Sequence, residues 1–391
     1  MEDWGTVLMP GGVRDLLPGE ARQKRELENS LLKLFRSWGY QEVVTPTFEF
    51  YEVLAPALEE MLHEQLYRFI DEEGRVIVLR PDMTTPIARL VSTRLRTEDF
   101  PLRFCYVANV FRRENHAGKQ REFYQAGVEL IGAAGAEADA EILGLMGEAF
   151  RLAGIKDFQI TIGQVEVLKG LLEGCGFGNE EQEKAKTILN KKDFVAWEKL
   201  ISDHRFSGEQ REVLENLPHL QGGIEILDQV EGFLQSEDAL AGLSRLRFVW
   251  EILTDYGLED HVSFDLGFLR GLGYYTGIIF EGYAPGVGYP LCGGGRYDRL
   301  LEKFGFSCPA TGFAINIERF LLAMKEEKIQ VTPAMRVADY FIVGENFGEV
   351  AKKARQLREQ GFVVEIEVSG RSPEEAVAYA AKKGVPHILV M

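Results

Sequence analysis

The sequence predicts an α+β protein with a helical insertion and a small C-terminal α/β domain, and three patterns indicate this fold class. Two strand-like runs, 102–111 and 121–132, flank a strongly polar loop, as in a β-hairpin. The stretch from about 164 to 258 is rich in Glu, Lys and Leu at helical spacing. Apolar runs and helical patterns then alternate from 340 to 391 as β-α-β-α-β.

The length of the chain indicates more than one domain. Its 391 residues exceed the usual size of a single core, and 46% hydrophobic with 27% charged residues is typical of folded proteins. A linker-like stretch begins at residue 329. We therefore predict a core domain over 1–328, which carries the insertion, and a C-terminal domain over 329–391.

Composition also limits the environment and the partners. No apolar stretch is long enough to cross a bilayer, and the first residues lack the pattern of a signal peptide, so we expect a cytoplasmic protein without membrane contact. Lys and Arg total 44 against 61 Asp and Glu, a net charge of −17, which disfavours nucleic acid as the main partner. Four widely spaced cysteines, without a CxxC pair, predict buried thiols and neither a metal site nor a disulfide framework.

The N-terminal third contains a candidate ligand corner. A helix is expected over 20–38, followed by a strand over 40–48 that Pro46 should confine to an edge or an interface. Asp82 and Thr84 follow the short apolar run that ends at Leu79, where a strand gives way to a helix. Side chains and free N–H groups at such a junction can reach a ligand.

Two polar residues on one strand form the centre of the predicted site. Side chains alternate across 121–132, so Gln125 and Glu129 share a face on either side of Gly127, which should leave room above the sheet. An amide and a carboxylate there could bind a polar, partly cationic ligand. The alternative is an exposed polar face with an apolar back.

A second cluster favours the ligand interpretation. Arg270 stands among apolar residues and leads through glycines to Tyr274 and Tyr275. A partly buried arginine needs an anionic partner, either a ligand carboxylate or phosphate or, alternatively, a structural ion pair. The glycine-rich run before Tyr297 could hold a phosphate but lacks a Walker lysine pattern, so it is weak by itself.

The order of motifs resembles the class II aminoacyl-tRNA synthetase core, within it the histidyl type. The matching segments are Gly12–Asp15, Trp38–Pro46 (motif 1, a dimer strand), Phe111–Glu129 (motif 2), Arg270–Tyr275, Gly294–Asp298 and Gly312–Arg319 (motif 3). The resemblance implies an antiparallel sheet flanked by helices. It also implies a histidine site made of Asp82, Thr84, Arg112, Gln125, Glu129, Arg270, Tyr274, Tyr275 and Tyr297. Arg112 and Arg319 match the arginines that hold ATP phosphates in working synthetases.

At several motif positions the sequence departs from the synthetase pattern, and these departures are similar to those of a second family with the same fold. Asn115-His116-Ala117 replaces the usual Arg-Pro-Gln, Asp82 replaces a glutamate, and Gly273 stands where an aspartate is expected. They resemble the regulatory subunits of ATP phosphoribosyltransferase. The resemblance implies a catalytically inactive protein with no cofactor that joins a short catalytic subunit and conveys histidine feedback in histidine biosynthesis. An active histidyl-tRNA synthetase with a divergent motif 2 loop is the alternative, and an orphan amino-acid-binding module is a weaker one.

Overall fold

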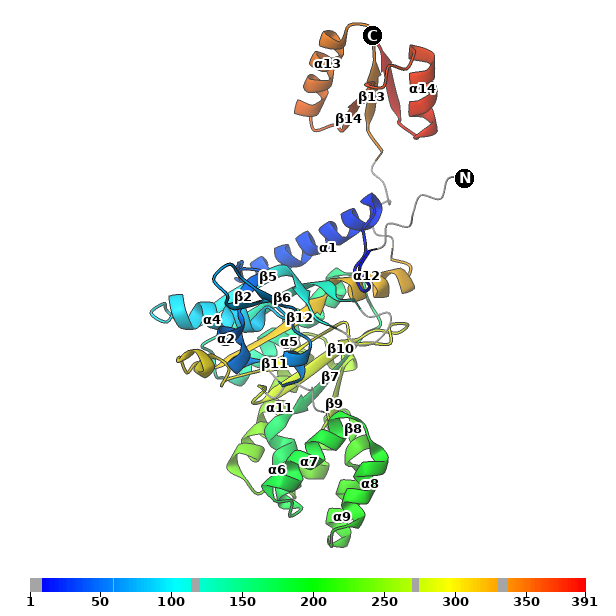
Figure 1. Cartoon of the computed structure of the whole chain (residues 1–391). Helices are drawn as coiled ribbons and strands as arrows, with labels where there is room; N and C mark the ends of the chain where they lie inside the picture. Colours follow the sequence, from blue (N-terminus) through cyan, green and yellow to red (C-terminus); the bar gives the residue numbers. More distant parts are fainter. Residues whose placement is uncertain (1–8, 59, 114–119, 269–273, 330–336) are drawn as a thin grey trace. The chain divides into compact units, whose positions relative to one another are not determined.

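The computed structural model describes residues 9–58, 60–113, 120–268, 274–329 and 337–391. The chain divides into two compact units (Figure 1). One comprises Met1–Asp15 and Gln23–Gln330, and the other comprises Leu16–Arg22 and Val331–Met391.

A nine-stranded sheet is the centre of the first unit within the described ranges. Its order is β1-β5-β6-β12-β11-β10-β7-β9-β8. Antiparallel pairing runs from β5 to β7, and the parallel pairs, β1 with β5 and β7 with β9, lie toward the edges. The predicted hairpin and the antiparallel core are confirmed. The strands are β1 (Gln41–Glu42), β5 (Leu102–Phe111), β6 (Glu122–Ile131), β7 (Gln159–Gln164), β8 (Gln221–Gly222), β9 (Val262–Asp265), β10 (Ile278–Tyr283), β11 (Cys292–Arg296) and β12 (Ala310–Asn316).

Helices cover both faces of this sheet near the predicted site. On one face, Ile87 and Val91 of α4 (Thr84–Arg94) share a core cluster with Tyr106 and Ile131. On the other face, the ring of Phe35 in α1 (Pro18–Ser37) contacts the ring of Phe313 in β12 edge-on, with centroids 6.1 Å apart. Phe313 is the ladder partner of Val128 in β6. The faces of β6 are therefore both buried. The remaining flanking helices are α5 (Ala136–Leu152), α12 (Ile317–Glu326) and the 3-10 turn η4 (Leu301–Phe304).

The strand expected over 40–48 is wrong as a single element. The chain forms β1 and then β2 (Phe48–Phe50), which belongs to a separate sheet of order β2-β4-β3 with β3 (Arg68–Ile70) and β4 (Val76–Leu79). Pro46 has no N–H to donate, and the carbonyl of Thr45 is bound by Arg80 at 2.8 Å, so the ladder is interrupted there. The short elements α2 (Tyr51–Leu54), η1 (Ala55–Ala57) and α3 (Glu60–Glu64) link β2 to β3.

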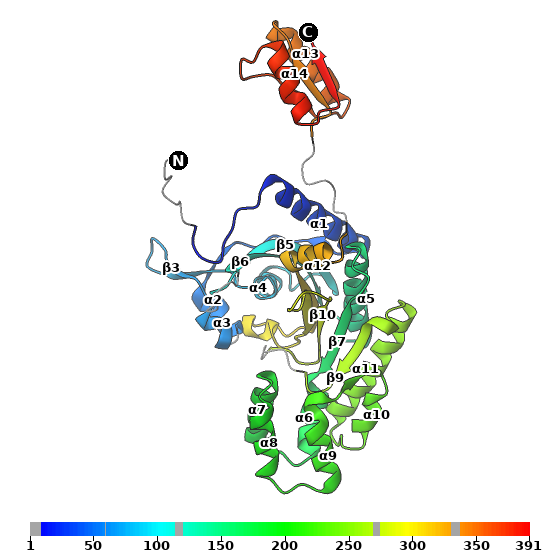
Figure 2. The ribbon, with the colours of Figure 1, turned by 90° about the vertical axis from the view of Figure 1, so that its right-hand side faces the viewer.

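The segment between β7 and β9 is mostly helical, as its sequence pattern predicts. Its long helix α11 (Glu237–Asp255) packs on α5 and on α6 (Val165–Gly174), as Figure 2 shows. The other helices are α7 (Asn179–Asn190), α8 (Phe194–Ser202), α9 (Gly208–Asn216) and α10 (Ile226–Glu231), with the 3-10 turns η2 (Leu217–His219) and η3 (Glu259–His261).

The C-terminal unit has the predicted β-α-β-α-β pattern. Its three strands pair in parallel in the order β14-β13-β15, and Ala376 and Ala380 pack beneath them with Phe341. The elements are β13 (Tyr340–Val343), α13 (Phe347–Glu359), β14 (Val364–Ile366), α14 (Pro373–Lys382) and β15 (His387–Val390).

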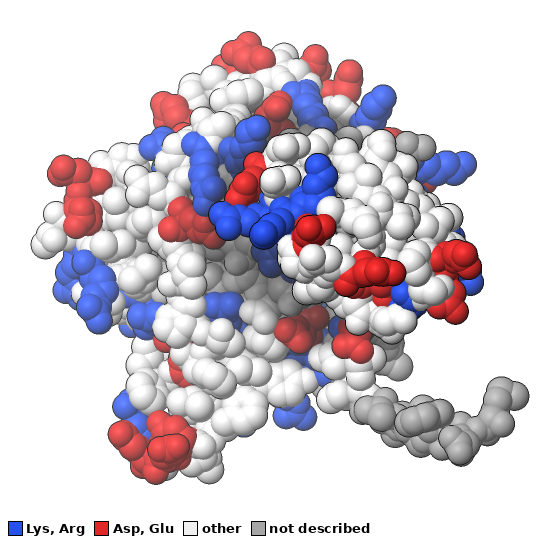
Figure 3. Space-filling model, turned by 90° about the horizontal axis from the view of Figure 1, so that it is seen from above, with Lys and Arg blue, Asp and Glu red and all other residues white. Residues whose placement is uncertain are grey.

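The cysteines, the helix lengths and the surface charge concern the molecule as a whole. All four cysteines are unpaired and buried, in agreement with the prediction of buried thiols. The described helices include none that is long and apolar enough to span a membrane, and the described residues contain no group of His, Cys, Asp or Glu able to hold a metal ion. On the face shown in Figure 3, acidic and basic side chains are interspersed among uncharged ones.

Candidate ligand-binding site

Glu129 lies at the centre of the site and is only 1% exposed. It projects from β6 toward the N-terminus of α4, where the Thr84 hydroxyl donates a hydrogen bond to Oε1 at 2.7 Å. The hydroxyl of Tyr297, which follows β11, donates to Oε2. The exposed polar face considered for this strand is therefore wrong, because the carboxylate is buried and bound by donors from two other elements.

Burial dominates the protonation of this carboxyl. Desolvation raises the pKa of Glu129 to about 8, although the hydrogen bonds from Tyr297 and Thr84 favour the charged form. The nearby Asp82 carboxylate adds to the rise. No Lys or Arg among the described residues forms an ion pair with Glu129. The site thus contains a buried acid without a described countercharge.

The corner between β4 and α4 is fixed by arginines. Arg80 is buried and donates to the carbonyl of Asn109 at 2.9 Å and to its side chain at 3.0 Å, in addition to its bond to Thr45. Arg112 donates from Nε to the Pro81 carbonyl at 2.8 Å. These bonds hold the turn so that Thr84 faces Glu129.

Asp82 has a local partner in this structure. Its carboxylate accepts from the N–H of Thr85 at 2.8 Å and from the Thr85 hydroxyl at 3.3 Å, and it thereby binds the free donors at the start of α4. Burial raises the pKa of Asp82, and the Arg112 charge opposes that rise. Asp82 thus holds a second carboxyl group beside the site in a fixed position.

Tyrosine rings form the next wall. Tyr274 meets Tyr297 edge-on with centroids 5.9 Å apart and lies 4.7 Å from the ring of Tyr275. Burial and the Glu129 charge raise the pKa of Tyr297 well above its ordinary value, so this hydroxyl is a donor at neutral pH. The structure thus brings the aromatic part of the predicted set to Glu129.

Two buried polar atoms at the site have no hydrogen-bond partner among the described residues: Oε1 of Gln125 and the hydroxyl of Tyr106. Tyr106 is the ladder partner of Gly127, and a Cβ at Gly127 would collide with the Tyr106 hydroxyl and with the Phe313 carbonyl. The expected room above Gly127 is thus occupied by the Tyr106 ring. Buried polar atoms are nearly always paired, so these two indicate a place for a polar ligand.

The structure does not test every predicted residue. Asp82, Thr84, Gln125, Glu129 and the three tyrosines lie at or beside the site in the described ranges, and Arg112 lies behind Pro81. Arg270 lies outside the described residues, as do Gly273 and the Asn115–Ala117 segment. Sequence inspection missed Tyr106, although its position opposite Gly127 in the hairpin could have indicated it.

Arg319, the other predicted ATP arginine, lies in the first turn of α12. It donates to the Pro290 carbonyl at 2.6 Å, and its guanidinium lies 5.3 Å from the centre of the Tyr289 ring. It is thus anchored at the β12 to α12 junction.

The glycine-rich run considered as a phosphate loop has a structural explanation. It forms β11, where a Cβ at Gly294 would collide with the backbone of β12. Arg296 at its end is buried and forms an ion pair with Asp139 at 2.9 Å. These glycines permit close packing of strands, which contradicts a phosphate loop at this position.

Comparisons with known proteins agree with this architecture. Residues 12–320 match the family model described as histidyl-tRNA synthetase. A solved structure from Bacillus halodurans, described as an ATP phosphoribosyltransferase regulatory subunit/histidyl-tRNA synthetase, aligns with a TM-score of 0.88 at 32% identity and covers 98% of each chain. Histidyl-tRNA synthetase from Nostoc has the same fold, with a TM-score of 0.79 at 23% identity, over 97% of this chain and 90% of that chain.

Curated relatives narrow the assignment. A protein from Moorella thermoacetica is 49% identical over 96% of both chains, and one from Acetivibrio thermocellus is 42% identical over 100% of this chain and 93% of its own. Both are named ATP phosphoribosyltransferase regulatory subunit. The chain therefore belongs to the ATP phosphoribosyltransferase regulatory subunits, a family with the histidyl-tRNA synthetase fold.

Proposed function

We propose that this chain binds L-histidine at Glu129 and conveys its presence to a short catalytic ATP phosphoribosyltransferase subunit. The observation that carries the proposal is the buried Glu129 carboxyl, with donors from Thr84 and Tyr297 on one side and the unpartnered atoms of Tyr106 and Gln125 beside it. The relatives' name supplies the catalytic partner.

The chemistry of histidine suits this arrangement. An imidazolium bound at Glu129 supplies the positive charge that its described neighbours lack, and it stabilises the carboxylate against the cost of burial. Because the carboxyl has a pKa of about 8 in the free site, it is mostly protonated at neutral pH. Pairing with an imidazolium lowers this pKa, so the charged carboxylate forms when the ligand binds. In this proposal Asp82, Thr84 and Gln125 hold the ligand's ammonium group, and Arg270 binds its carboxylate.

Feedback then requires that histidine binds more tightly to an assembly state with low catalytic activity. By linkage, the catalytic subunit must change histidine affinity by the same factor. We also propose self-association through the motif 1 segment. β1 is an edge strand of the nine-stranded sheet, and Val44 beside it is 85% exposed; an open sheet edge of this kind supports an interface there. Sedimentation of Val44→Asp, which should be a monomer, tests this part.

Calorimetry of the full chain tests the ligand. Wild type should bind L-histidine, and Glu129→Ala should abolish measurable binding because the imidazole partner is removed. Glu259→Ala, which removes an exposed carboxylate, is the matched control and should bind as wild type does. Unchanged affinity in Glu129→Ala would place the site elsewhere.

Reconstitution tests the partner. A catalytic phosphoribosyltransferase without its own regulatory domain should associate with this chain, gain activity, and become inhibited by histidine. Absence of association would contradict the proposal. Robust charging of tRNA with histidine by the purified chain would instead support the synthetase alternative.

A further inference from the structure

We infer that a second pocket, next to the Glu129 site, binds a small phosphate monoester that carries a ring, such as a nucleoside monophosphate. The pocket has a volume of about 920 Å³ and lies between α6, α11, the segment that precedes β10 and the turn η4. This volume lies within the range for small-molecule sites. The inference does not depend on histidine binding.

Two cationic side chains give the pocket its ligand preference. Arg299 and Lys303 line it and are exposed, and their side chains have no hydrogen bond or ion pair with any other described residue. Both line the pocket from one short segment of the chain, with Arg299 just before η4 and Lys303 within it. Two unpaired cations, one of them a planar guanidinium, match the charge and geometry of a phosphate dianion.

The other lining arginines are already engaged. Arg245 donates to Asp139 at 2.6 Å and to the Ala134 carbonyl at 2.8 Å. Arg296 binds Asp139 and, at 3.1 Å, Asp298. Their charges are compensated within the protein, so the net positive charge available to a ligand comes from Arg299 and Lys303.

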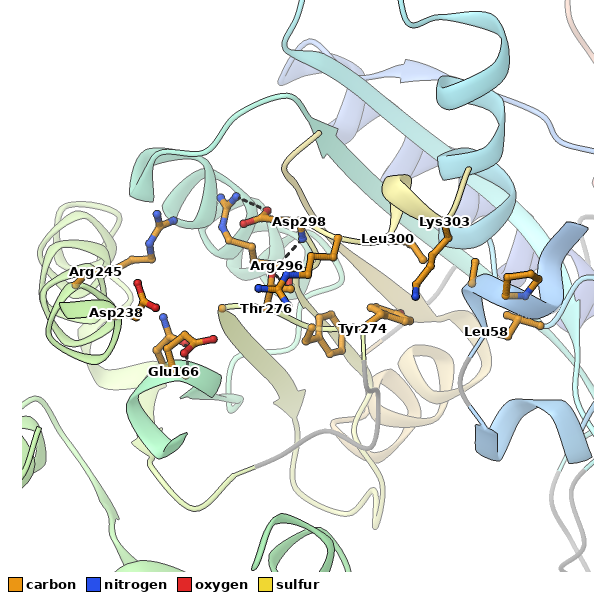
Figure 4. A pocket seen from close by; sticks show the side chains of 18 residues that line it. Leu58, Glu166, Asp238, Arg245, Tyr274, Thr276, Arg296, Asp298, Leu300 and Lys303 are labelled. Carbon is orange, nitrogen blue, oxygen red and sulfur yellow. Dashed lines mark hydrogen bonds and ion pairs between the residues drawn. The ribbon is translucent and has the colours of Figure 1, made fainter. Parts of the chain in front are cut away.

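The remaining walls indicate what accompanies the phosphate. Figure 4 shows the side chain of Lys303 pointing toward the Tyr274 ring, with Leu300 beside it, a surface suited to stacking of a flat ring. At the opposite end lie Glu166 and Asp238. These carboxylates can accept from hydroxyl groups but repel a second anionic group, so the pocket favours a ligand with one phosphate.

Equilibrium binding of AMP to the full chain tests the inference. Wild type should bind AMP saturably, and the double variant Arg299→Glu/Lys303→Glu should weaken binding by at least about tenfold, because charge reversal replaces attraction by repulsion. The control, Lys352→Glu/Lys382→Glu, makes the same charge change on exposed positions of the C-terminal unit and should leave AMP affinity unchanged. Arg299→Gln/Lys303→Gln should show a smaller loss, and it serves if the reversal variant misfolds.

Other probes define the outcomes. Adenosine should bind far more weakly than AMP, and inorganic phosphate should bind more weakly than AMP. Equal affinity for adenosine would overturn the role of the cations, and equal affinity for phosphate would overturn the role of the ring. Absence of saturable AMP binding at millimolar concentration would overturn the site. AMP binding could also survive in the double variant and be lost in Arg319→Ala. This result would assign AMP to the predicted ATP arginines and would overturn the second pocket as its site. Histidine affinity, measured on the same preparations, reports separately on the Glu129 site.

Discussion

Glu129 and Asp139 are both carboxylates in the core of the first unit, at 1% and 0% exposure, and they differ in what surrounds them. Asp139 lies between two guanidinium groups, with Arg296 at 2.9 Å and Arg245 at 2.6 Å. Among the described residues, Glu129 has hydroxyl donors alone, from Thr84 and Tyr297. A buried acid with its countercharge present is explained by the fold, whereas one without a described countercharge is the basis of the ligand site that we propose.

The largest effect is expected from removal of Asp139. Asp139→Ala leaves Arg296 buried without its main partner, and loss of one member of a buried pair costs about 3–5 kcal/mol of unfolding free energy. Urea denaturation followed by circular dichroism measures it. Glu148→Ala, a carboxylate on the same helix with a partly exposed ion pair, is the control. A loss of unfolding free energy below about 1 kcal/mol, the size typical of surface ion pairs, would show that the Asp139 pair is not a buried structural pair.

Glu129→Gln should have a pH-dependent effect on stability. The carboxyl has a pKa of about 8 when folded and 4.5 when unfolded, so the folded state holds the proton more tightly. The protonated Glu129 carboxyl contributes fully to the unfolding free energy below pH 4.5. This contribution declines as the pH rises from 4.5 to about 8 and is lost above that. Glutamine does not titrate, so the difference between wild type and variant should change by up to about 1.4 kcal/mol per pH unit in that window.

Denaturation at several pH values in this window provides the measurement. Glu129→Gln should gain stability relative to wild type as pH rises. A difference that stays constant across the window would show that burial does not control this carboxyl. Histidine binding should nevertheless be lost in the same variant, because an amide cannot pair with an imidazolium.

Tyr106→Phe should have the smallest effect. The Tyr106 hydroxyl is buried without a described partner, so its removal should leave the free protein unchanged or more stable by about 1 kcal/mol. If the hydroxyl completes the ligand site, histidine affinity should fall by about tenfold, the value of one hydrogen bond to a polar ligand. Calorimetry and urea denaturation on the same protein separate the two effects. Lower stability with unchanged affinity would indicate an internal partner.

Much of the site could be predicted from residue order. Alternation along β6 placed Gln125 and Glu129 on one face, and the strand-to-helix junction placed Thr84 at a helix start. Local backbone periodicity determines these features, so they are readable from the chain. The helical insertion and the C-terminal β-α-β-α-β pattern follow from the same periodicity.

Other features depended on contacts between distant segments. Pro46 indicated an edge or interface strand, but the assignment of β1 and β2 to different sheets depends on Arg80 binding the Thr45 carbonyl. The glycines of β11 looked like a loop until the neighbouring strand showed why a Cβ is excluded there.

The sequence by itself determined the fold class, the order of the motifs and the residue types at the site. Only the tertiary structure decided which buried acid is compensated: Asp139 receives Arg296 from 157 residues away, whereas Glu129 receives Tyr297 from 168 residues away. The two partners are adjacent residues of one chain segment, and the pleat directs them to different carboxylates. Whether a carboxylate meets a cation or a neutral hydroxyl is decided by this long-range register, which no local pattern encodes.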